Sequence, residues 1–268
     1  MSFLKQIMYL EKELKAAINA AKKASKVILD YYHHGFRVET KADDSPVTSA
    51  DKASDKLIRE MLSKEFKDYA FLTEESYSKN DLDRFNHDYV WIVDPLDGTK
   101  DFVCHDDSFT INIALSYKHE AVLGVVLIPV RNEIYFATKG SGAFVERNGE
   151  IKKIHVSEKT SDLICFTSAF HFTDEEKAMI KKHEDKIKHV KKQGSSVKAC
   201  LIAEGKGEIS YRLNDGTKEW DTAAFQIIVE EAGGFVLKPN GERILYNRED
   251  VYNRDGYVIM NKKENFLL

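Results

Sequence analysis

Residues 89–102 read Tyr-Val-Trp-Ile-Val-Asp-Pro-Leu-Asp-Gly-Thr-Lys-Asp-Phe, and this stretch decides the fold class expected for the chain. The apolar run 89–93 predicts a buried β-strand. The strand is expected to stop at Asp94-Pro95, because proline has no N–H to donate to a central ladder. Asp94 and Asp97 would then lie at the carboxyl end of a strand, where α/β sheets commonly bind their ligands. Two carboxylates three residues apart in such a turn can share one hard cation.

The turn continues with Gly98 and Thr99. Glycine lets a ligand approach the backbone closely, and the two N–H groups can cradle a phosphate. An EF-hand loop is excluded, because it needs Gly at its sixth position and Gly98 is fifth. A Walker loop is excluded because the Gly-Lys-Ser/Thr ending is missing. The residues alone leave two other interpretations open: an aspartyl-phosphate nucleophile, and an acidic turn that only caps a helix.

Further acidic residues lie at the ends of predicted elements: Glu74-Glu75 after the strand 70–73, Asp221 at the start of the helix 220–232, and Asp51 in the first turn of a helix that begins near Thr48. Each of them alone is explained by capping or by a solvated strand end. Taken with the Asp94 turn, they predict an acidic centre built from distant parts of the chain.

The rest of the chain predicts two unlike halves. A helix over 3–32, ending at Gly35, and a helix over 48–65 are predicted. Short strands follow between residues 70 and 146, which indicate an antiparallel sheet flanked by the two helices. From about residue 158 strands and helices alternate, with a helix expected over 173–187 and a strand near 189, and this alternation is typical of a smaller layered α/β unit. No linker rich in Pro, Gly or Ser separates 1–157 from 158–268, so we expect these subdomains to share an extensive interface.

Composition limits the function classes. Forty basic and forty-four acidic residues give a net charge of −4, with no basic excess for a nucleic-acid polymer or a membrane surface. Cys104, Cys165 and Cys200 show neither a disulfide framework nor a zinc spacing, which favours reduced thiols in the cytoplasm. The longest apolar run, 121–130, is too short to cross a bilayer, so no integral membrane segment is expected.

Together these pieces resemble the inositol monophosphatase superfamily of metal-dependent, lithium-sensitive phosphatases. The superfamily pattern is Asp, Glu-Glu, Asp-Pro-apolar-Asp-Gly-Thr, Trp-Asp and Gly-Gly. Its counterparts occur here in the same order: Asp51, Glu74-Glu75, 94–99, Trp220-Asp221 and Gly233-Gly234. The match covers nearly the whole chain. It implies a fold of mixed α/β class, a layered α-β-α-β-α sandwich.

Within the superfamily, some segments are similar to the 3′(2′),5′-bisphosphate nucleotidases of the CysQ type: 41–51, Lys100 after the Asp-Gly-Thr turn, and 194–205 leading to Tyr211-Arg212 and 218–224. The chain departs from that pattern twice. The stretch between Arg212 and Trp220 is about one residue longer, and Phe225 stands where a small residue is usual. Both departures lie near the expected substrate pocket, so they bear on which substrate is bound and not on the reaction.

The resemblance implies a role for each site residue. Glu74, Asp94 and the Leu96 carbonyl would hold a first Mg²⁺, and Asp94, Asp97 and Asp221 a second. The implied catalytic residues are Asp51, Thr99 and Glu74, with Thr99 hydrogen-bonded to Asp51 so that it orients the attacking water. The N–H groups of Gly98 and Thr99 would hold phosphoryl oxygens. The implied nucleotide contacts are Gly194, Ser195, Lys198 and Arg212.

The predicted activity is removal of the 3′-phosphate of adenosine 3′,5′-bisphosphate, with 3′-phosphoadenylyl sulfate as a further candidate substrate. Two alternatives stay open. An inositol or sugar phosphatase on the same fold would not require the basic pair Lys198 and Arg212, which suits a second anionic group. A metal- or nucleotide-binding protein without activity would not require Asp51, Glu74 and Thr99. The resemblance also implies a homodimer.

Overall fold

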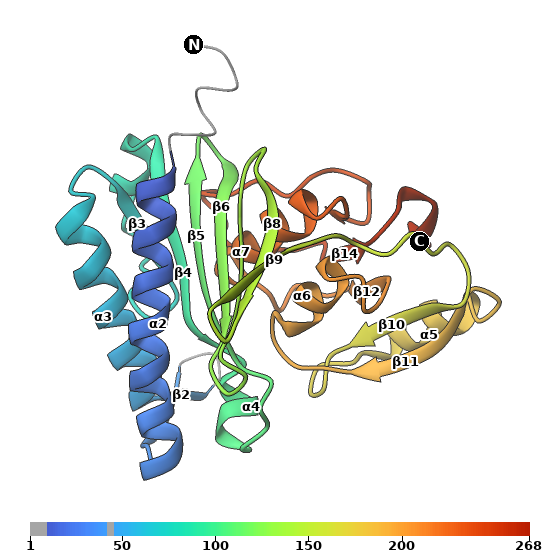
Figure 1. Cartoon of the computed structure of the whole chain (residues 1–268), viewed down its shortest axis with the longest axis horizontal. Coiled ribbons are helices and arrows are strands. Elements are labelled where there is room, and N and C mark those ends of the chain that lie inside the picture. Colours follow the sequence, from blue (N-terminus) through green and yellow to red (C-terminus); the bar gives the residue numbers. More distant parts are fainter. Residues whose placement is uncertain (1–9, 42–45) are drawn as a thin grey trace.

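The computed structural model describes residues 10–41 and 46–268, which form five alternating layers of helices and sheets (Figure 1). Helices α2 (Glu11–His34) and α3 (Ser49–Glu65) cover one face of a seven-stranded sheet. The other face packs against α7 (Glu219–Glu231), with α6 (Val197–Ala203) beside it. A five-stranded sheet covers these helices, and α5 (Asp174–Lys182) packs on its far side. The predicted α-β-α-β-α sandwich is therefore confirmed.

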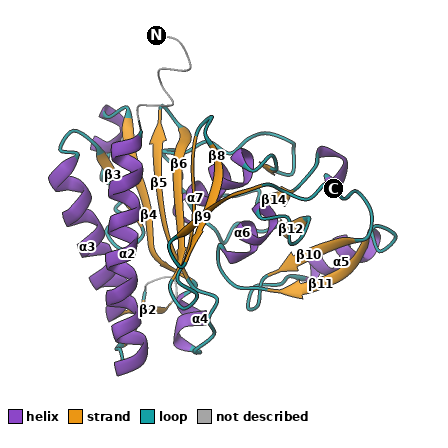
Figure 2. Ribbon diagram, in the orientation of Figure 1, coloured by secondary structure: helices purple, strands orange, loops and turns teal. Residues whose placement is uncertain are grey.

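The seven strands of the larger sheet lie side by side in chain order (Figure 2). They are β3 (Ala70–Thr73), β4 (Tyr89–Asp97), β5 (Thr110–Tyr117), β6 (Glu120–Ile128), β7 (Glu133–Thr138), β8 (Gly142–Arg147) and β9 (Glu150–Ile154). Strands β3 and β4 are parallel, and each later pair is antiparallel. The predicted sheet is thus antiparallel except at this one edge.

The smaller sheet has the strand order β11 (Ile187–Lys192), β10 (Leu163–Thr167), β12 (Ile209–Arg212), β14 (Tyr257–Met260), β13 (Phe235–Leu237). A short antiparallel pair, β1 (Val38–Thr40) and β2 (Pro46–Thr48), lies on either side of the undescribed residues. The remaining short elements are α4 (Thr99–Val103) and the 3₁₀ turns η1 (Asp83–Asn86) and η2 (Lys263–Asn265). No helix in the described ranges is long and apolar enough to span a membrane.

Local sequence explains where the first two described helices end and begin. Helix α2 ends at Gly35, whose φ of 103° is unfavourable for a side chain, and the Gly35 N–H donates to the Tyr31 carbonyl. Helix α3 begins with a capping box, in which Asp51 Oδ2 accepts from the Thr48 N–H at 2.8 Å. Both ends agree with the sequence predictions. The predicted helix residues before 10 lie outside the described ranges.

Helix α7 lies directly on strand β6. A Cβ atom at Gly124 would lie 2.2 Å from the Ala224 carbonyl oxygen and 2.5 Å from Ile227 Cγ2. A side chain at this strand position would therefore push the helix away from the sheet. The helix comes from the second half of the sequence, so the two halves share one hydrophobic core. The larger sheet ends at Ile154 and the smaller begins at Leu163, while the division into subdomains at residue 157 stays a prediction.

Three local predictions were wrong. Strand β4 does not stop at Asp94 but continues through Pro95 to Asp97. Strand β9 was not predicted, because four of its five residues are exposed and it lacks apolar alternation. The helix expected over 173–187 ends at Lys182, and the basic residues that follow form the edge strand β11. Lysines on an edge strand oppose pairing with another sheet.

Candidate active site

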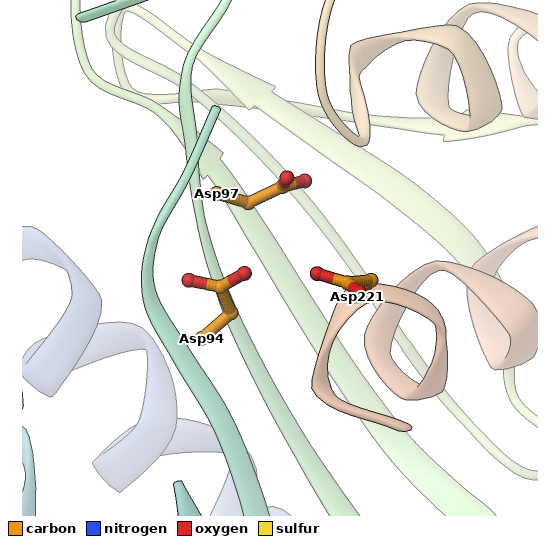
Figure 3. Close-up of side chains that lie close together, drawn as sticks. All are labelled: Asp94, Asp97 and Asp221. Atoms are coloured by element: carbon orange, nitrogen blue, oxygen red, sulfur yellow. The ribbon is translucent and has the colours of Figure 1, made fainter. Parts of the chain in front are cut away.

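Three aspartates from two distant segments point toward one another (Figure 3). Asp94 and Asp97 come from the end of β4, and Asp221 comes from the first turn of α7. One carboxylate oxygen from each residue lies within 4.8 Å of the other two. The acidic centre expected from the sequence thus forms where the end of a strand meets the start of a helix.

A β-bulge places Asp94 and Asp97 on one face of the sheet. Alternation along a regular strand would send residues three apart to opposite faces. Here Asp94 pairs with Asn112 and Asp97 with Thr110, so three steps along β4 match two along β5. The extra residue shifts the alternation of side chains along β4 by one position and brings both carboxylates to the same side of the sheet. It also explains why Pro95 is tolerated, because the register with β3 ends at Val93.

The three aspartates repel one another in a buried setting. Asp94 is only 1% exposed, and burial together with the charges of Glu74, Asp97 and Asp221 raises its pKa well above its usual range. Burial and the charges of Asp97 and Glu74 raise the pKa of Asp221 to about 7. A divalent cation offsets this repulsion and stabilises the ionised carboxylates. The donors are all oxygen atoms, which fit a hard cation such as Mg²⁺.

Ser196 fixes the position of Asp97, and sequence reasoning did not single it out. Asp97 Oδ2 accepts hydrogen bonds from the Ser196 N–H at 2.8 Å and from Ser196 Oγ at 2.7 Å. The same oxygen accepts from Asn112 Nδ2 and Thr110 Oγ1, each at 3.2 Å. Ser196 is the N-cap residue of α6 and lies in the segment 194–205 that resembles the CysQ type, but nothing in the sequence indicated its contact with Asp97. These bonds tie the Asp94–Asp97 turn to the segment that begins at Gly194.

Glu74 lies beside the three aspartates, but its carboxylate is outside their set of mutually close oxygens. Lys41 Nζ donates to Glu74 Oε1 at 2.7 Å and to Glu75 Oε1 at 2.6 Å. Burial opposes the charge of Lys41, but the two carboxylates outweigh it and raise the pKa of the ammonium. Burial also raises the pKa of Glu75, to about 7. Sequence reasoning placed Lys41 only within a family motif and did not predict this contact.

Thr99 and Asp51 form the predicted hydrogen-bonded pair. Thr99 Oγ1 donates to Asp51 Oδ1 at 3.0 Å and lies 3.4 Å from the Leu96 carbonyl oxygen. Asp51 Oδ2 accepts from Thr48 Oγ1 at 2.5 Å, in addition to the capping bond. Asp51 is buried, and burial raises its pKa despite these hydrogen bonds. Its carboxylate is therefore held rigidly and is a stronger base than an exposed aspartate.

A cleft of about 640 Å³ opens over these residues. The predicted site residues that line it are Glu74, Asp97, Gly98, Thr99, Ser195, Lys198, Arg212 and Asp221. The other four, Asp51, Asp94, Leu96 and Gly194, are not among the lining residues. The fold therefore brings the predicted acidic and basic residues to one cleft.

Two cationic side chains, Lys198 and Arg212, also line the cleft. Lys198 Nζ donates to the Ser195 carbonyl at 2.7 Å, and burial lowers the pKa of this ammonium to about 8. Arg212 Nη1 donates to the His171 carbonyl at 2.9 Å. Desolvation and the nearby cations, Arg212 first among them, lower the pKa of His171 to about 4. His171 also lines the cleft.

Two glycines let the backbone segments of the site approach closely. Gly98 has a φ of +88°, which favours glycine, at the start of α4. A Cβ atom at Gly194 would lie 2.1 Å from Asp101 Oδ1 and 2.9 Å from Ser108 Cβ. The carboxylate of Asp101 thus occupies the space that any side chain at position 194 would need. The segment that follows the Asp94–Asp97 turn and the segment with Lys198 are packed against each other at this point.

The sequence profile described as the inositol monophosphatase family matches residues 9–267. The chain belongs to the inositol monophosphatase family. This confirms the family predicted from the sequence and the phosphatase class that it implies. The roles of individual site residues stay predictions.

Named relatives of this family member cover most of its length. CysQ of Salmonella typhimurium, a 3′(2′),5′-bisphosphate nucleotidase, is 34% identical over 249 residues, which cover 92% of this chain and 98% of that protein. Nus factor SuhB of Pasteurella multocida is 34% identical over 238 residues, 85% of each chain. The crystal structure of CysQ from Bacteroides thetaiotaomicron matches with a TM-score of 0.83 and 32% identity, covering 96% of this chain and 99% of the other.

Proposed function

We propose that this chain is a Mg²⁺-dependent phosphatase that removes the 3′-phosphate of adenosine 3′,5′-bisphosphate. One observation carries the proposal: a single cleft is lined by Asp97 and Asp221 of the acidic cluster and also by Lys198 and Arg212. The acidic residues suit a metal-assisted reaction at one phosphate. The basic residues suit a second anionic group. The CysQ relative from Salmonella, which is named a 3′(2′),5′-bisphosphate nucleotidase, supports the same substrate class.

The metal ligands in this proposal are Glu74, Asp94, the Leu96 carbonyl, Asp97 and Asp221, which would hold two or more Mg²⁺ ions. When bound, such ions make water a stronger nucleophile at neutral pH and stabilise charge on the phosphoryl group and on the leaving oxygen. Binding requires that Lys41 release Glu74, or that Glu74 use its second oxygen, because Lys41 Nζ lies 2.7 Å from Glu74 Oε1.

Thr99 and Asp51 would move the proton of the attacking water. Thr99 Oγ1 donates to Asp51 Oδ1, so its lone pairs are left to accept a hydrogen bond from a water in the cleft. As that water attacks phosphorus, its proton passes to Thr99 while the Thr99 proton passes to Asp51. The raised pKa of Asp51 makes it a better proton acceptor. Glu74, whose charge acts on Asp51, is the third residue proposed for this step.

The substrate contacts follow from the lining of the cleft. The N–H groups of Gly98 and Thr99 would hold oxygens of the phosphate that is transferred. Gly194, Ser195, Lys198 and Arg212 would bind the nucleotide, with the two cations on the 5′-phosphate. A 5′-phosphosulfate would meet the same cations, so 3′-phosphoadenylyl sulfate is a second proposed substrate. The homodimer and the cytoplasmic location stay predictions.

Phosphate release by the purified chain tests the proposal. We expect turnover of adenosine 3′,5′-bisphosphate with Mg²⁺, none with a chelator, and inhibition by millimolar lithium. The kcat/KM for this nucleotide should exceed that for inositol 1-phosphate. The reverse preference would make the chain an inositol phosphatase. No release from either compound, with nucleotide binding intact, would make it a binding protein without activity.

A further inference from the structure

Phe225 forms an apolar part of the cleft wall beside the acidic centre. It lies four residues after Asp221 on α7, and that spacing puts the two side chains on one face of the helix. Phe225 lines the cleft although it is only 3% exposed, so only a small part of its side chain meets the open space. The Tyr257 ring, which also lines the cleft, has its centroid 5.7 Å away.

The ring has little freedom to move aside. Residues 224 and 227 of the same helix press on strand β6 at Gly124, where a Cβ atom would lie 2.2 Å from the Ala224 carbonyl oxygen. On the cleft side Tyr257 is held in strand β14, which pairs with β12 at Arg212. Phe225 therefore presents a fixed surface to a substrate, because moving its packed ring would cost free energy.

We propose that Phe225 is a specificity-determining residue that selects nucleoside phosphates against ring phosphates with a hydroxyl on every carbon. This inference rests on the proposed function. An inositol phosphate carries hydroxyl groups around the whole ring, so one that faces Phe225 loses water without gaining a hydrogen bond. A nucleoside offers C–H edges of the ribose and an aromatic base, which pack on an aromatic ring without that loss. The apolar wall thus weakens the binding of inositol phosphates relative to that of nucleotides.

The measured quantity is the ratio of kcat/KM for adenosine 3′,5′-bisphosphate to kcat/KM for inositol 1-phosphate, with Mg²⁺. Phe225→Ala removes the ring and leaves space for water beside the substrate. We expect the ratio to fall by about tenfold or more, because contacts of this size discriminate by about 10- to 200-fold. Val229→Ala is the matched control, since Val229 is buried on the same helix but does not line the cleft. It should lower thermal stability and leave the ratio unchanged.

The outcomes separate the inference from the proposed function. Turnover of the nucleotide by the unaltered chain tests the function, and the shift of the ratio in the Phe225 variant tests the inference. An unchanged ratio in folded Phe225→Ala would overturn the role of this residue, even if the nucleotide remains the preferred substrate. If the alanine variant does not fold, Phe225→Leu decides: it keeps apolar volume without a flat ring, and we expect about a threefold fall. A leucine variant with the original ratio also overturns the inference.

Discussion

Thr99 Oγ1 donates a hydrogen bond to Asp51 Oδ1 at 3.0 Å and thereby joins the first residue of α4 to the first turn of α3. The other Asp51 oxygen is held by Thr48, whose backbone N–H and hydroxyl both donate to it. A capping box, which ordinarily only starts a helix, here orients a carboxylate toward the cleft. The proposed proton path therefore depends on the local geometry of this helix start.

Thr99→Val should impair turnover without impairing metal binding. Valine keeps the shape of threonine but cannot accept a proton or donate to Asp51. We expect kcat to fall by about 10²- to 10⁴-fold, the usual range for loss of a general acid–base group. Thr99→Ser keeps the hydroxyl and should retain much of the activity. Steady-state kinetics with a Mg²⁺ titration by calorimetry checks this, and a valine variant with near-normal kcat would rule out the relay.

Asp94→Asn should abolish metal binding at the acidic centre. Asp94 is shared between both proposed cations, and an amide in its place removes one negative charge from the set of close oxygens. The substitution also removes the buried charge whose pKa is raised by desolvation and by Glu74, Asp97 and Asp221, so the variant should unfold at an equal or higher temperature without metal. Calorimetric Mg²⁺ titration and thermal unfolding with a chelator measure both effects. Full Mg²⁺ affinity in this variant would contradict the assigned ligands.

Lys41→Gln should tighten metal binding. The Lys41 ammonium contacts Glu74 and Glu75, so it competes with a cation for the Glu74 carboxylate. Without this positive charge we expect the apparent Mg²⁺ dissociation constant to fall several-fold, which corresponds to the free energy of about one partly buried ion pair. Lys41→Arg, which keeps the charge, is the control. Weaker Mg²⁺ binding in the glutamine variant would mean that Lys41 supports the metal site instead of competing with it.

Substrate affinity should decline above about pH 8. Burial lowers the pKa of Lys198 to about 8, so its ammonium is charged below that pH and neutral above it. Attraction to the 5′-phosphate is present below pH 8 and lost as pH rises through it. KM for adenosine 3′,5′-bisphosphate should therefore rise on the alkaline side, with less change in kcat. The arginine in Lys198→Arg stays charged, so KM in this variant should change little with pH. An identical rise of KM in that variant would assign the pH dependence to another titrating group.

Gly194→Ala should weaken substrate binding, and a second substitution, Asp101→Gly, should partly restore it. The added methyl group would lie 2.1 Å from Asp101 Oδ1, so the 194–198 segment or the carboxylate must shift. We expect a several-fold or larger rise in KM from the single substitution, because Lys198 moves with this segment. The double variant removes the first clash, although Ser108 Cβ at 2.9 Å still crowds the site. Additive effects of the two substitutions would show that they do not interact.

Sequence reasoning succeeded where a signal is local. The Thr48–Asp51 capping box, the Gly35 helix end and the start of α7 each depend on neighbouring residues, and the structure has all three. The family motif then identified the acidic residues that the fold brings together. The fold class could be predicted for the same reason, since its helices and most strands have clear periodicity.

Features that depend on a distant partner could not be predicted. The bulge at Pro95 exists because β5 supplies Asn112 and Thr110 as pairing partners. No residue near Pro95 in the sequence indicates this strand register. Ser196 holds Asp97 across 99 residues of sequence. The bulge shows how proline can occur near the end of a central strand, where one neighbour has already stopped.

The contact at Gly124 links the composition of one strand to the spacing of the proposed metal ligands. Ala224 and Ile227 reach the backbone of β6 there, three and six residues beyond Asp221 on the same helix. A single extra methyl group on the strand would lift the helix and carry Asp221 away from Asp94 and Asp97. The spacing of the proposed metal ligands thus depends on the absence of a side chain at Gly124, on a strand that supplies no proposed ligand itself.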